Sequence, residues 1–117
     1  MGLTVVIVDD HPTFRSSARR LLEGEGFEVV GEAADGASAI EAARSLRPDV
    51  VLLDVMLPDI DGFEVAATLA SNGNPAAVVL TSSHDPRDFG TLIEESGARG
   101  FISKAELSSE TLRALLE

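Results

Sequence analysis

The segment Val50-Val51-Leu52-Leu53-Asp54 constrains the fold more than any other part of the sequence. Consecutive apolar residues, including β-branched valines, are typical of a strand that is buried on both faces, as in a parallel sheet. The run ends on a carboxylate. In an open α/β sheet, the ligand crevice lies outside the carboxyl ends of the strands. The segment therefore predicts a central buried strand that presents Asp54 at the edge where chemistry is expected.

Strand and helix patterns alternate along the rest of the chain. The expected strands cover residues 4–8, 27–33, 50–54, 76–80 and 99–103. Helices are expected after each strand, beginning near residues 12, 36, 63, 86 and 107, and the fourth is expected to run unbroken to Gly97. This alternation predicts a parallel sheet with helices on both faces and right-handed crossovers. We therefore expect an α/β fold, a single doubly wound (βα)5 flavodoxin-like domain with a five-stranded sheet in the order 2-1-3-4-5.

Length and composition limit the class of protein. The chain has 117 residues, which suits one domain over residues 1–117 without a separate output domain. There is no cysteine, which fits a reducing compartment, and neither a signal peptide nor a membrane-spanning run is recognisable. We expect a cytoplasmic protein without membrane contact. The net charge of -11 would repel a phosphate backbone, so we expect no direct nucleic-acid binding by this domain.

Polar residues follow the apolar runs at the expected carboxyl ends of four strands. Asp9 and Asp10 follow the first, Asp54 ends the third, Thr81 follows the fourth and Lys104 follows the fifth. The first and third strands are neighbours in the expected order, so these side chains should converge. Clustered carboxylates repel unless a proton or cation neutralises them, and an all-oxygen site suits Mg²⁺. A carboxylate can also accept a phosphoryl group, whose oxygens Mg²⁺, an ammonium and a hydroxyl would stabilise.

The same motifs give the chain a strong resemblance to a known family. They are the Asp9-Asp10 pair, Asp54 followed by Met-Leu-Pro and Asp-Gly, Thr81 after an apolar strand, and Gly-Ala-Arg-Gly-Phe-Ile-Ser ending at Lys104. In this order they resemble the receiver domain of bacterial two-component response regulators. The opening Asp-Asp-His-Pro with a following Phe-Arg resembles the subgroup whose receivers precede a LuxR-type helix-turn-helix. The resemblance covers essentially the whole chain.

The resemblance implies a metal site around the phosphoacceptor. Asp54 would be the residue that accepts the phosphoryl group. Asp10 would bind Mg²⁺ directly, and Asp9 would bind it directly or through water. Met56, two residues past the acceptor, would contribute its backbone carbonyl, so its side chain type would be unimportant.

The resemblance also implies how the phosphoryl group is recognised. Lys104 would pair with it, Thr81 would donate a hydrogen bond to it, and Phe101 stands where the family carries its switching aromatic residue. The segment from Thr81 to Lys104 is one residue longer than is common in the family, which leaves Ser82 as a rival for the switch hydroxyl. Ala105 replaces a proline that many members carry after the lysine.

As implied partners we expect a sensor histidine kinase or a phosphotransfer protein. Phosphorylation would change docking or homodimer formation and thereby control an output such as transcription. The only chemistry expected is self-phosphorylation and self-dephosphorylation, so we do not expect a metabolic enzyme. The main alternative is a protein-interaction module with the receiver fold that works without phosphorylation. A phosphatase of the haloacid dehalogenase type would require an aspartate at position 56, and a flavin-binding protein would require a hydroxyl- and glycine-rich first loop.

Two further groups of residues receive structural interpretations. His11 and His84 are isolated histidines, to which we assign no chemistry. Arg15, Arg19 and Arg20 fall on the first predicted helix, where we expect them to form a solvated face; the alternative is a surface that a kinase or relay partner uses.

Overall fold

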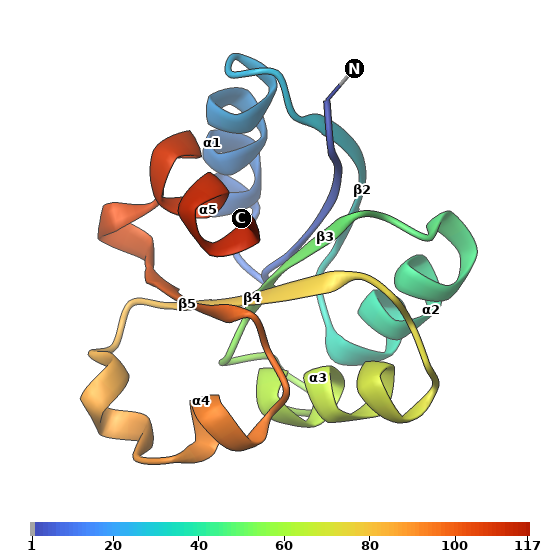
Figure 1. Ribbon diagram of the computed structural model, residues 1–117, viewed down its shortest axis with the longest axis vertical. Coiled ribbons are helices and arrows are strands. Elements are labelled where there is room, and N and C mark those ends of the chain that lie inside the picture. Colours follow the sequence, from blue (N-terminus) through green and yellow to red (C-terminus); the bar gives the residue numbers. More distant parts are fainter. Residues whose placement is uncertain (1) are drawn as a thin grey trace.

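The computed structural model describes residues 2–117 and contains five strands in one parallel sheet. The strands are β1 (Thr4–Val8), β2 (Glu28–Ala33), β3 (Val50–Asp54), β4 (Ala77–Ser82) and β5 (Gly100–Ser103), in the order β2-β1-β3-β4-β5 (Figure 1). This confirms the predicted doubly wound topology. Strand β4 extends two residues beyond the predicted end, because Thr81 and Ser82 continue its pairing with β5.

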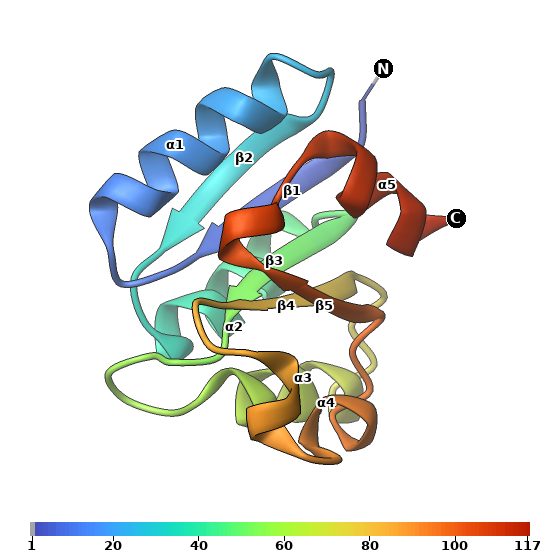
Figure 2. The same ribbon diagram turned by 90° about the vertical axis from the view of Figure 1, so that its left-hand side faces the viewer.

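Helices cover both faces of the sheet. They are α1 (Pro12–Glu23), α2 (Gly36–Leu46), α3 (Gly62–Ser71), α4 (Leu92–Glu95) and α5 (Ser109–Leu116), with short 3-10 helices η1 (Pro86–Phe89) and η2 (Lys104–Glu106). Helices α1 and α5 lie on one side of the sheet, and α2, α3 and α4 lie on the other (Figure 2). No helix in the described part of the chain is long and apolar enough to cross a membrane.

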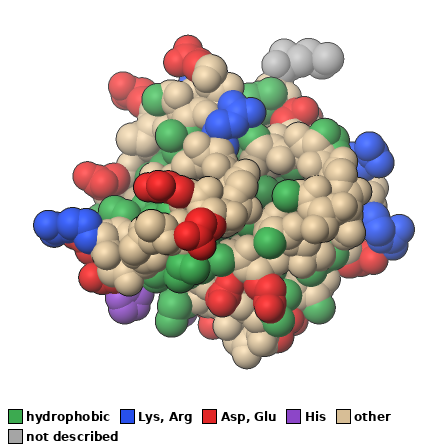
Figure 3. Space-filling view, turned by 60° about the horizontal axis from the view of Figure 1, so that its bottom comes forward, with side chains coloured by type: hydrophobic (Ala, Val, Ile, Leu, Met, Phe, Trp, Pro, Cys, Tyr) green, Lys and Arg blue, Asp and Glu red, His purple; other side chains and the backbone are tan. Residues whose placement is uncertain are grey.

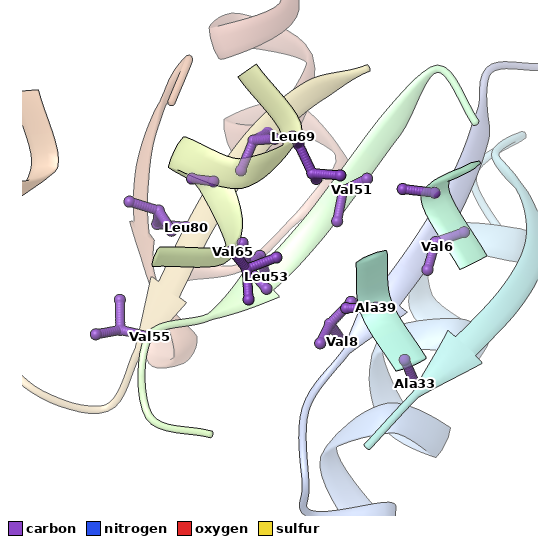
Figure 4. Close-up of a cluster of buried hydrophobic side chains, with 13 residues drawn as sticks. Val6, Val8, Ala33, Ala39, Val51, Leu53, Val55, Val65, Leu69 and Leu80 are labelled. Carbon is purple, nitrogen blue, oxygen red and sulfur yellow. The ribbon is translucent and has the colours of Figure 1, made fainter. Parts of the chain in front are cut away.

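Side-chain alternation along the strands builds two separate cores. Val6, Val8, Val51 and Leu53 point toward α2 and α3, where they pack with Leu69 and its neighbours (Figure 4). The intervening residues of β1 and β3 point to the opposite face and pack under α1 and α5. Successive strand residues face opposite sides of a sheet, so a strand covered on both sides needs an unbroken apolar run. This explains why β3 is buried along its whole length.

The prediction of an unbroken fourth helix from Pro86 to Gly97 is wrong. The structure has η1 over Pro86–Phe89, a break, and a four-residue α4. The break occurs at Gly90, whose φ of 57° cannot continue a right-handed helix. The last helix also begins later than predicted, at Ser109, because Ser108 and Thr111 form a capping box.

Gly62 allows α3 to begin directly against the end of β3. Its N–H donates to the carbonyl of Val55 at 2.8 Å. A Cβ atom at this position would lie 2.5 Å from the backbone oxygen of Asp54 and 2.9 Å from Val55 Cα. Both contacts are with backbone, which cannot rotate away as a flexible side chain can. The close approach therefore places a steric constraint beside Asp54.

We predict that Gly62→Ala lowers the free energy of unfolding by about 2 kcal/mol, because overpacking against backbone forces a local shift. Urea denaturation would measure the change. Gly24→Ala is the matched control, since Gly24 has right-handed helical φ and ψ and a Cβ atom there would lie 3.2 Å from its nearest neighbour. The control should change stability by less than about 1 kcal/mol. Equal effects of the two substitutions would contradict this explanation.

Candidate functional site

The register of the sheet brings the acidic residues together at one edge. Val8 of β1 pairs with Leu53 of β3, so the residue after each lies at the same level. Asp54 in turn pairs with Thr81 of β4. The N–H of Asp9 donates to the carbonyl of Ala33 at 3.0 Å, which extends the β1–β2 ladder by one residue. The predicted convergence of Asp9 and Asp54 is therefore present.

The carboxylates differ in their exposure to solvent. Asp9 is fully buried and Asp54 is 2% exposed, whereas the Asp10 side chain is 36% exposed. One side-chain ligand atom from each of Asp9, Asp10, His11 and Asp54 lies within 4.8 Å of the others. Buried carboxylates are costly unless they are paired or bound to a cation. The cluster is thus open to solvent on the side of Asp10 and closed beneath Asp9 and Asp54.

Lys104 provides the cation nearest to the buried carboxylates. Its Nζ lies 2.6 Å from Asp9 Oδ2 and donates a 3.3 Å hydrogen bond to Asp54 Oδ2. The ammonium also lies 4.6 Å from the centroid of the Phe14 ring, within the range of a cation–π contact. Lys104 begins η2 directly after β5, so the strand end fixes the origin of this side chain. One ammonium therefore faces two buried carboxylates.

The charges of this trio are unevenly compensated. Burial is the largest influence on the pKa of Asp54 and raises it, the hydrogen bond from the Met56 N–H opposes this, and smaller effects of Asp9 and Lys104 act in opposite directions; the pKa is raised overall. Burial also disfavours the charged form of Asp9, but bonds from Lys104 and His11 outweigh it and leave its pKa lowered. For Lys104, burial is outweighed by the two carboxylates, and its pKa is raised. Asp9 and Lys104 thus form the ion pair, and Asp54 is the carboxylate whose charge is poorly compensated.

Two hydroxyl residues lie at the end of β4, and their hydrogen bonding differs. Thr81 and Ser82 are both completely buried. Ser82 Oγ accepts a 3.0 Å hydrogen bond from the N–H of His84. Among residues 2–117, Thr81 Oγ1 is a buried side-chain oxygen without a hydrogen-bond partner, whereas the buried Asp9 Oδ2 is engaged only by the ammonium of Lys104. Leaving a buried hydroxyl unpaired costs free energy, so Thr81 favours a state in which a ligand reaches its Oγ1.

Phe101 and Met56 flank this centre without entering the acidic cluster. The half-buried Phe101 ring lies 6.0 Å from the ring of Phe89, which contacts Phe63 edge-on at 5.4 Å. This aromatic row joins β5 to η1 and α3. Met56 is 54% exposed as a residue, while its N–H donates to Asp54 Oδ1 at 3.1 Å. The main chain of Met56, rather than its side chain, therefore contacts the site.

Sequence reasoning missed the involvement of His11 and two arginines. His11 Nδ1 lies 3.0 Å from Asp9 Oδ1 and 3.1 Å from Asp10 Oδ1. The prediction of a solvated face is wrong for Arg15, whose side chain is only 19% exposed, whereas Arg20 is exposed and the Arg19 side chain is 40% exposed. Arg15 and Arg19 both pair with Glu32 of β2. No pattern on a helix alone reveals which strand residue lies beneath it. The pairing of Ile7 with Glu32, which sets this geometry, is a property of the sheet.

The donor set fits a hard divalent cation. Carboxylate oxygens from Asp9, Asp10 and Asp54 are the ligands that Mg²⁺ prefers, and a partly hydrated ion matches an edge that is open to water. Asp9 Oδ2, which lies 2.6 Å from Lys104 Nζ, retains a further lone pair for such an ion or for its bound water. The imidazole of His11 is a poor ligand for Mg²⁺, and its side chain is 67% exposed at the open edge of the cluster.

Comparisons with known proteins agree with this geometry. A family model described as the response regulator receiver domain matches residues 5–117. The transcription regulator BvgA of Bordetella pertussis is 42% identical over 110 residues, which make up 94% of this chain and 53% of BvgA. The solved receiver domain of the response regulator NarL from Mycobacterium tuberculosis has a TM-score of 0.90 at 40% identity, covering 98% of this chain and 94% of that one.

A second solved structure has a similar relation to this chain. It is a LuxR-family two-component response regulator from Aurantimonas, with a TM-score of 0.89, 32% identity, and coverage of 99% of this chain and 84% of the other. The chain spans about half the length of the curated relatives that it matches. The chain belongs to the response regulator receiver domain family of two-component signalling, in the subgroup of LuxR- and NarL-type regulators.

The raised pKa of Asp54 predicts a pH-dependent effect of Asp54→Asn. A carboxyl whose pKa is higher in the folded than in the unfolded state loses stability as pH rises from its ordinary value of 3.8 through the raised value. Asp54→Asn should therefore raise the free energy of unfolding at pH 7 by on the order of 1 kcal/mol, and the advantage should shrink as pH falls toward 3.8.

Asp9→Asn provides a control of opposite sign. The pKa of Asp9 is lowered, so its charge stabilises the fold above pH 3.8, and that stabilisation disappears in acid. The substitution should lower stability at pH 7 by about 1–3 kcal/mol. Urea titrations of both variants in metal-free buffer between pH 4 and 7 would measure this. Destabilisation by Asp54→Asn at pH 7 would contradict the assignment of the poorly compensated charge.

Proposed function

We propose that this domain is the phosphoacceptor switch of a two-component phosphorelay. Asp54 accepts a phosphoryl group from the phosphohistidine of a sensor histidine kinase or a phosphotransfer protein. The observation that carries the proposal is the burial of Asp54 beside both Asp9 and Lys104. A carboxylate with poorly compensated charge, at the edge of a crevice and within reach of a cation, has the properties of an acceptor. Membership of the receiver family supports the same role.

Mg²⁺ is the proposed cofactor. The side chains of Asp9, Asp10 and Asp54 and the backbone carbonyl of Met56 would hold it. When bound, the ion neutralises the acidic cluster and the charge of the phosphoryl oxygens. This role accounts for three carboxylates that would otherwise repel one another across the cluster.

The transfer step uses residues that lie side by side. An Asp54 carboxylate oxygen attacks phosphorus, the new O–P bond forms as the P–N bond to the donor imidazole breaks, and the imidazole leaves with its electron pair. The ammonium of Lys104, now 3.3 Å from Asp54 Oδ2, shifts from the carboxylates to the phosphoryl oxygens. Thr81, whose hydroxyl has no partner in the described structure, donates to a second phosphoryl oxygen. Slow attack by water on the acyl phosphate resets the switch.

Movement of Thr81 toward the phosphoryl group would be transmitted through Phe101. This ring packs on Phe89 of η1, so its reorientation changes the packing of the interrupted fourth helix. The surface formed by α4, β5 and α5 would then present different contacts. We propose that homodimer formation or docking of a partner responds to this change, as a population shift between two packings of one fold.

The proposed output is transcription, acting in the cytoplasm through a part other than this domain. The relatives BvgA and NarL are named as transcription regulators. The domain itself carries a net charge of -11, which opposes contact with DNA. The face seen in Figure 3 carries acidic side chains among hydrophobic ones, and it forms no continuous basic patch. Ala105 in place of the common proline is the one feature that favours the alternative, a module that works without phosphorylation.

Phosphoryl transfer can be tested with a small-molecule donor. We predict that incubation with acetyl phosphate and Mg²⁺ adds a single phosphoryl group to the wild-type chain, as measured by intact mass. EDTA should prevent the adduct. Asp54→Asn should abolish it, whereas Asp61→Asn, which changes the N-cap of α3 in the same loop, should retain it. Absence of an adduct under every condition would favour the phosphorylation-independent module.

The two hydroxyl residues can be separated by substitution. We predict that Thr81→Ala still accepts the phosphoryl group but loses most of the phosphorylation-dependent shift in the NMR signals of Phe101 and η1. Ser82→Ala should keep that shift, because Ser82 Oγ is already engaged by the His84 N–H. The reverse result would assign the switch hydroxyl to Ser82.

A further inference from the structure

The side chain of Arg15 links helix α1 to the acidic loop. Arg15 lies near the start of α1, and its side chain is only 19% exposed. Its Nη1 donates a 2.6 Å hydrogen bond to the backbone carbonyl of Asp9. Its Nε donates at 3.0 Å to Oε1 of Glu32 on β2. The guanidinium therefore spans from the neighbouring strand to the main chain of a proposed metal ligand.

This contact completes the fixation of the Asp9 main chain. The N–H of Asp9 is bound to the carbonyl of Ala33, and its carbonyl is bound to Arg15. Helix α1 has no side-chain cap of its own, since the N-cap residue His11 makes no such bond. Asp10 lies in this uncapped turn, between Asp9 and His11. The turn is held locally by the N–H of His11, which donates to Asp9 Oδ1 at 2.8 Å. Arg15 adds the restraint on the Asp9 carbonyl, which this local bond does not provide.

The restraint reaches Asp10 through the peptide plane. The carbonyl of Asp9 and the N–H of Asp10 belong to one planar unit, so fixing the carbonyl fixes the direction in which the chain continues into Asp10. The Asp10 side chain is 36% exposed, and its contact is with the exposed His11 ring. The direction of the Asp10 side chain relative to the site consequently depends on the orientation of the Asp9–Asp10 peptide plane.

We propose that Arg15 is a positioning residue for the cation site, holding the Asp9–Asp10 peptide so that both carboxylates face the ion. This inference rests on the proposed Mg²⁺ site. Outer contacts that orient the residues binding a metal commonly affect its affinity by tenfold or more. Glu32 is the anchor of the arrangement, because it also binds the guanidinium of Arg19. Arg19 itself reaches the carbonyl of Val29 and does not contact Asp9.

A positioning role and a purely electrostatic role of Arg15 predict opposite changes in Mg²⁺ affinity when the residue is replaced. Arg15 is a cation close to an acidic cluster, so removal of its charge alone would tighten binding of a second cation. Loss of positioning would weaken binding. The sign of the change in affinity on Arg15→Met therefore distinguishes the two effects.

The experiment is isothermal titration of Mg²⁺ into the metal-free chain. Arg15→Met should raise the Kd by about tenfold. Arg15→Lys retains the charge but has one ammonium in place of the forked guanidinium, so it should also weaken binding, by several-fold. Arg19→Met is the matched control, because it removes a charge from the same helix and the same carboxylate partner without touching Asp9. Its Kd should stay within about twofold of wild type.

A second readout excludes a general loss of stability. With acetyl phosphate, the Mg²⁺ concentration for half-maximal phosphorylation should rise in Arg15→Met by the same factor as the Kd, while the rate at saturating Mg²⁺ stays near wild type. In the metal-free protein, the backbone NMR signals of Asp10 and His11 should shift in Arg15→Met but not in Arg19→Met.

Three results would overturn the proposal. Unchanged or tighter Mg²⁺ binding by Arg15→Met would show that Arg15 acts only through charge, or not at all. Equal weakening by Arg19→Met would assign the effect to general damage to α1. If the wild-type chain itself does not bind Mg²⁺, both the proposed cation site and the positioning role of Arg15 are rejected. This outcome differs from the first two because neither wild type nor any variant then gives a binding curve.

Discussion

The site depends on one electrostatic problem, which is the burial of Asp9 and Asp54 at the same sheet edge with a single lysine between them. Lys104 pairs at 2.6 Å with Asp9 and more loosely with Asp54. One ammonium cannot compensate two buried carboxylates equally, and the directions of their pKa changes reflect this. The charge that remains explains why a divalent cation, and then a phosphoryl group, would be accommodated at this edge.

The sheet makes this burial possible and reproducible. Backbone pairing aligns Val8 with Leu53 and Asp54 with Thr81, so strand register alone sets which polar groups meet. A slip of one residue would turn each strand's side chains to the opposite face. The two apolar cores, one on each side of the sheet, oppose such a slip because the buried residues of β1 and β3 alternate between them. The hydrophobic packing thereby specifies the geometry of the acidic site.

Helix α1 contributes more to the site than a cover for the sheet. Phe14 places its ring beside Lys104, and Arg15 holds the carbonyl of Asp9. These neighbouring residues thus contact the cationic and the acidic side of the centre. The face of α1 that reaches the sheet edge therefore connects the helix surface to the residues proposed to bind the metal and phosphoryl group.

Much of the fold and site can be predicted from the sequence because the relevant signals are local. The apolar run of β3 that ends in Asp54, and the aspartates after β1, define strands and their carboxyl ends without knowledge of the rest of the chain. The prediction of the fourth helix fails although Gly90 lies within it, because glycine inside a helical pattern does not by itself indicate a break. The short-range apolar spacing of Phe89 and Ile93 favours continuity, whereas packing on Phe63 and the turn at Gly90 interrupt the helix.

The amino-acid sequence alone is sufficient to predict the alternation of strands and helices, the strand order, and the acidic, hydroxyl and lysine residues that meet at the sheet edge. These follow from hydrophobic periodicity and from the rules of parallel sheets. The folded structure was needed to learn that Lys104 pairs more closely with Asp9 than with Asp54, that Thr81 Oγ1 lacks a partner among the described residues, and that Arg15 binds the Asp9 carbonyl. Such contacts join residues from different elements, and their geometry depends on the packing of helices against the sheet, which no single segment encodes.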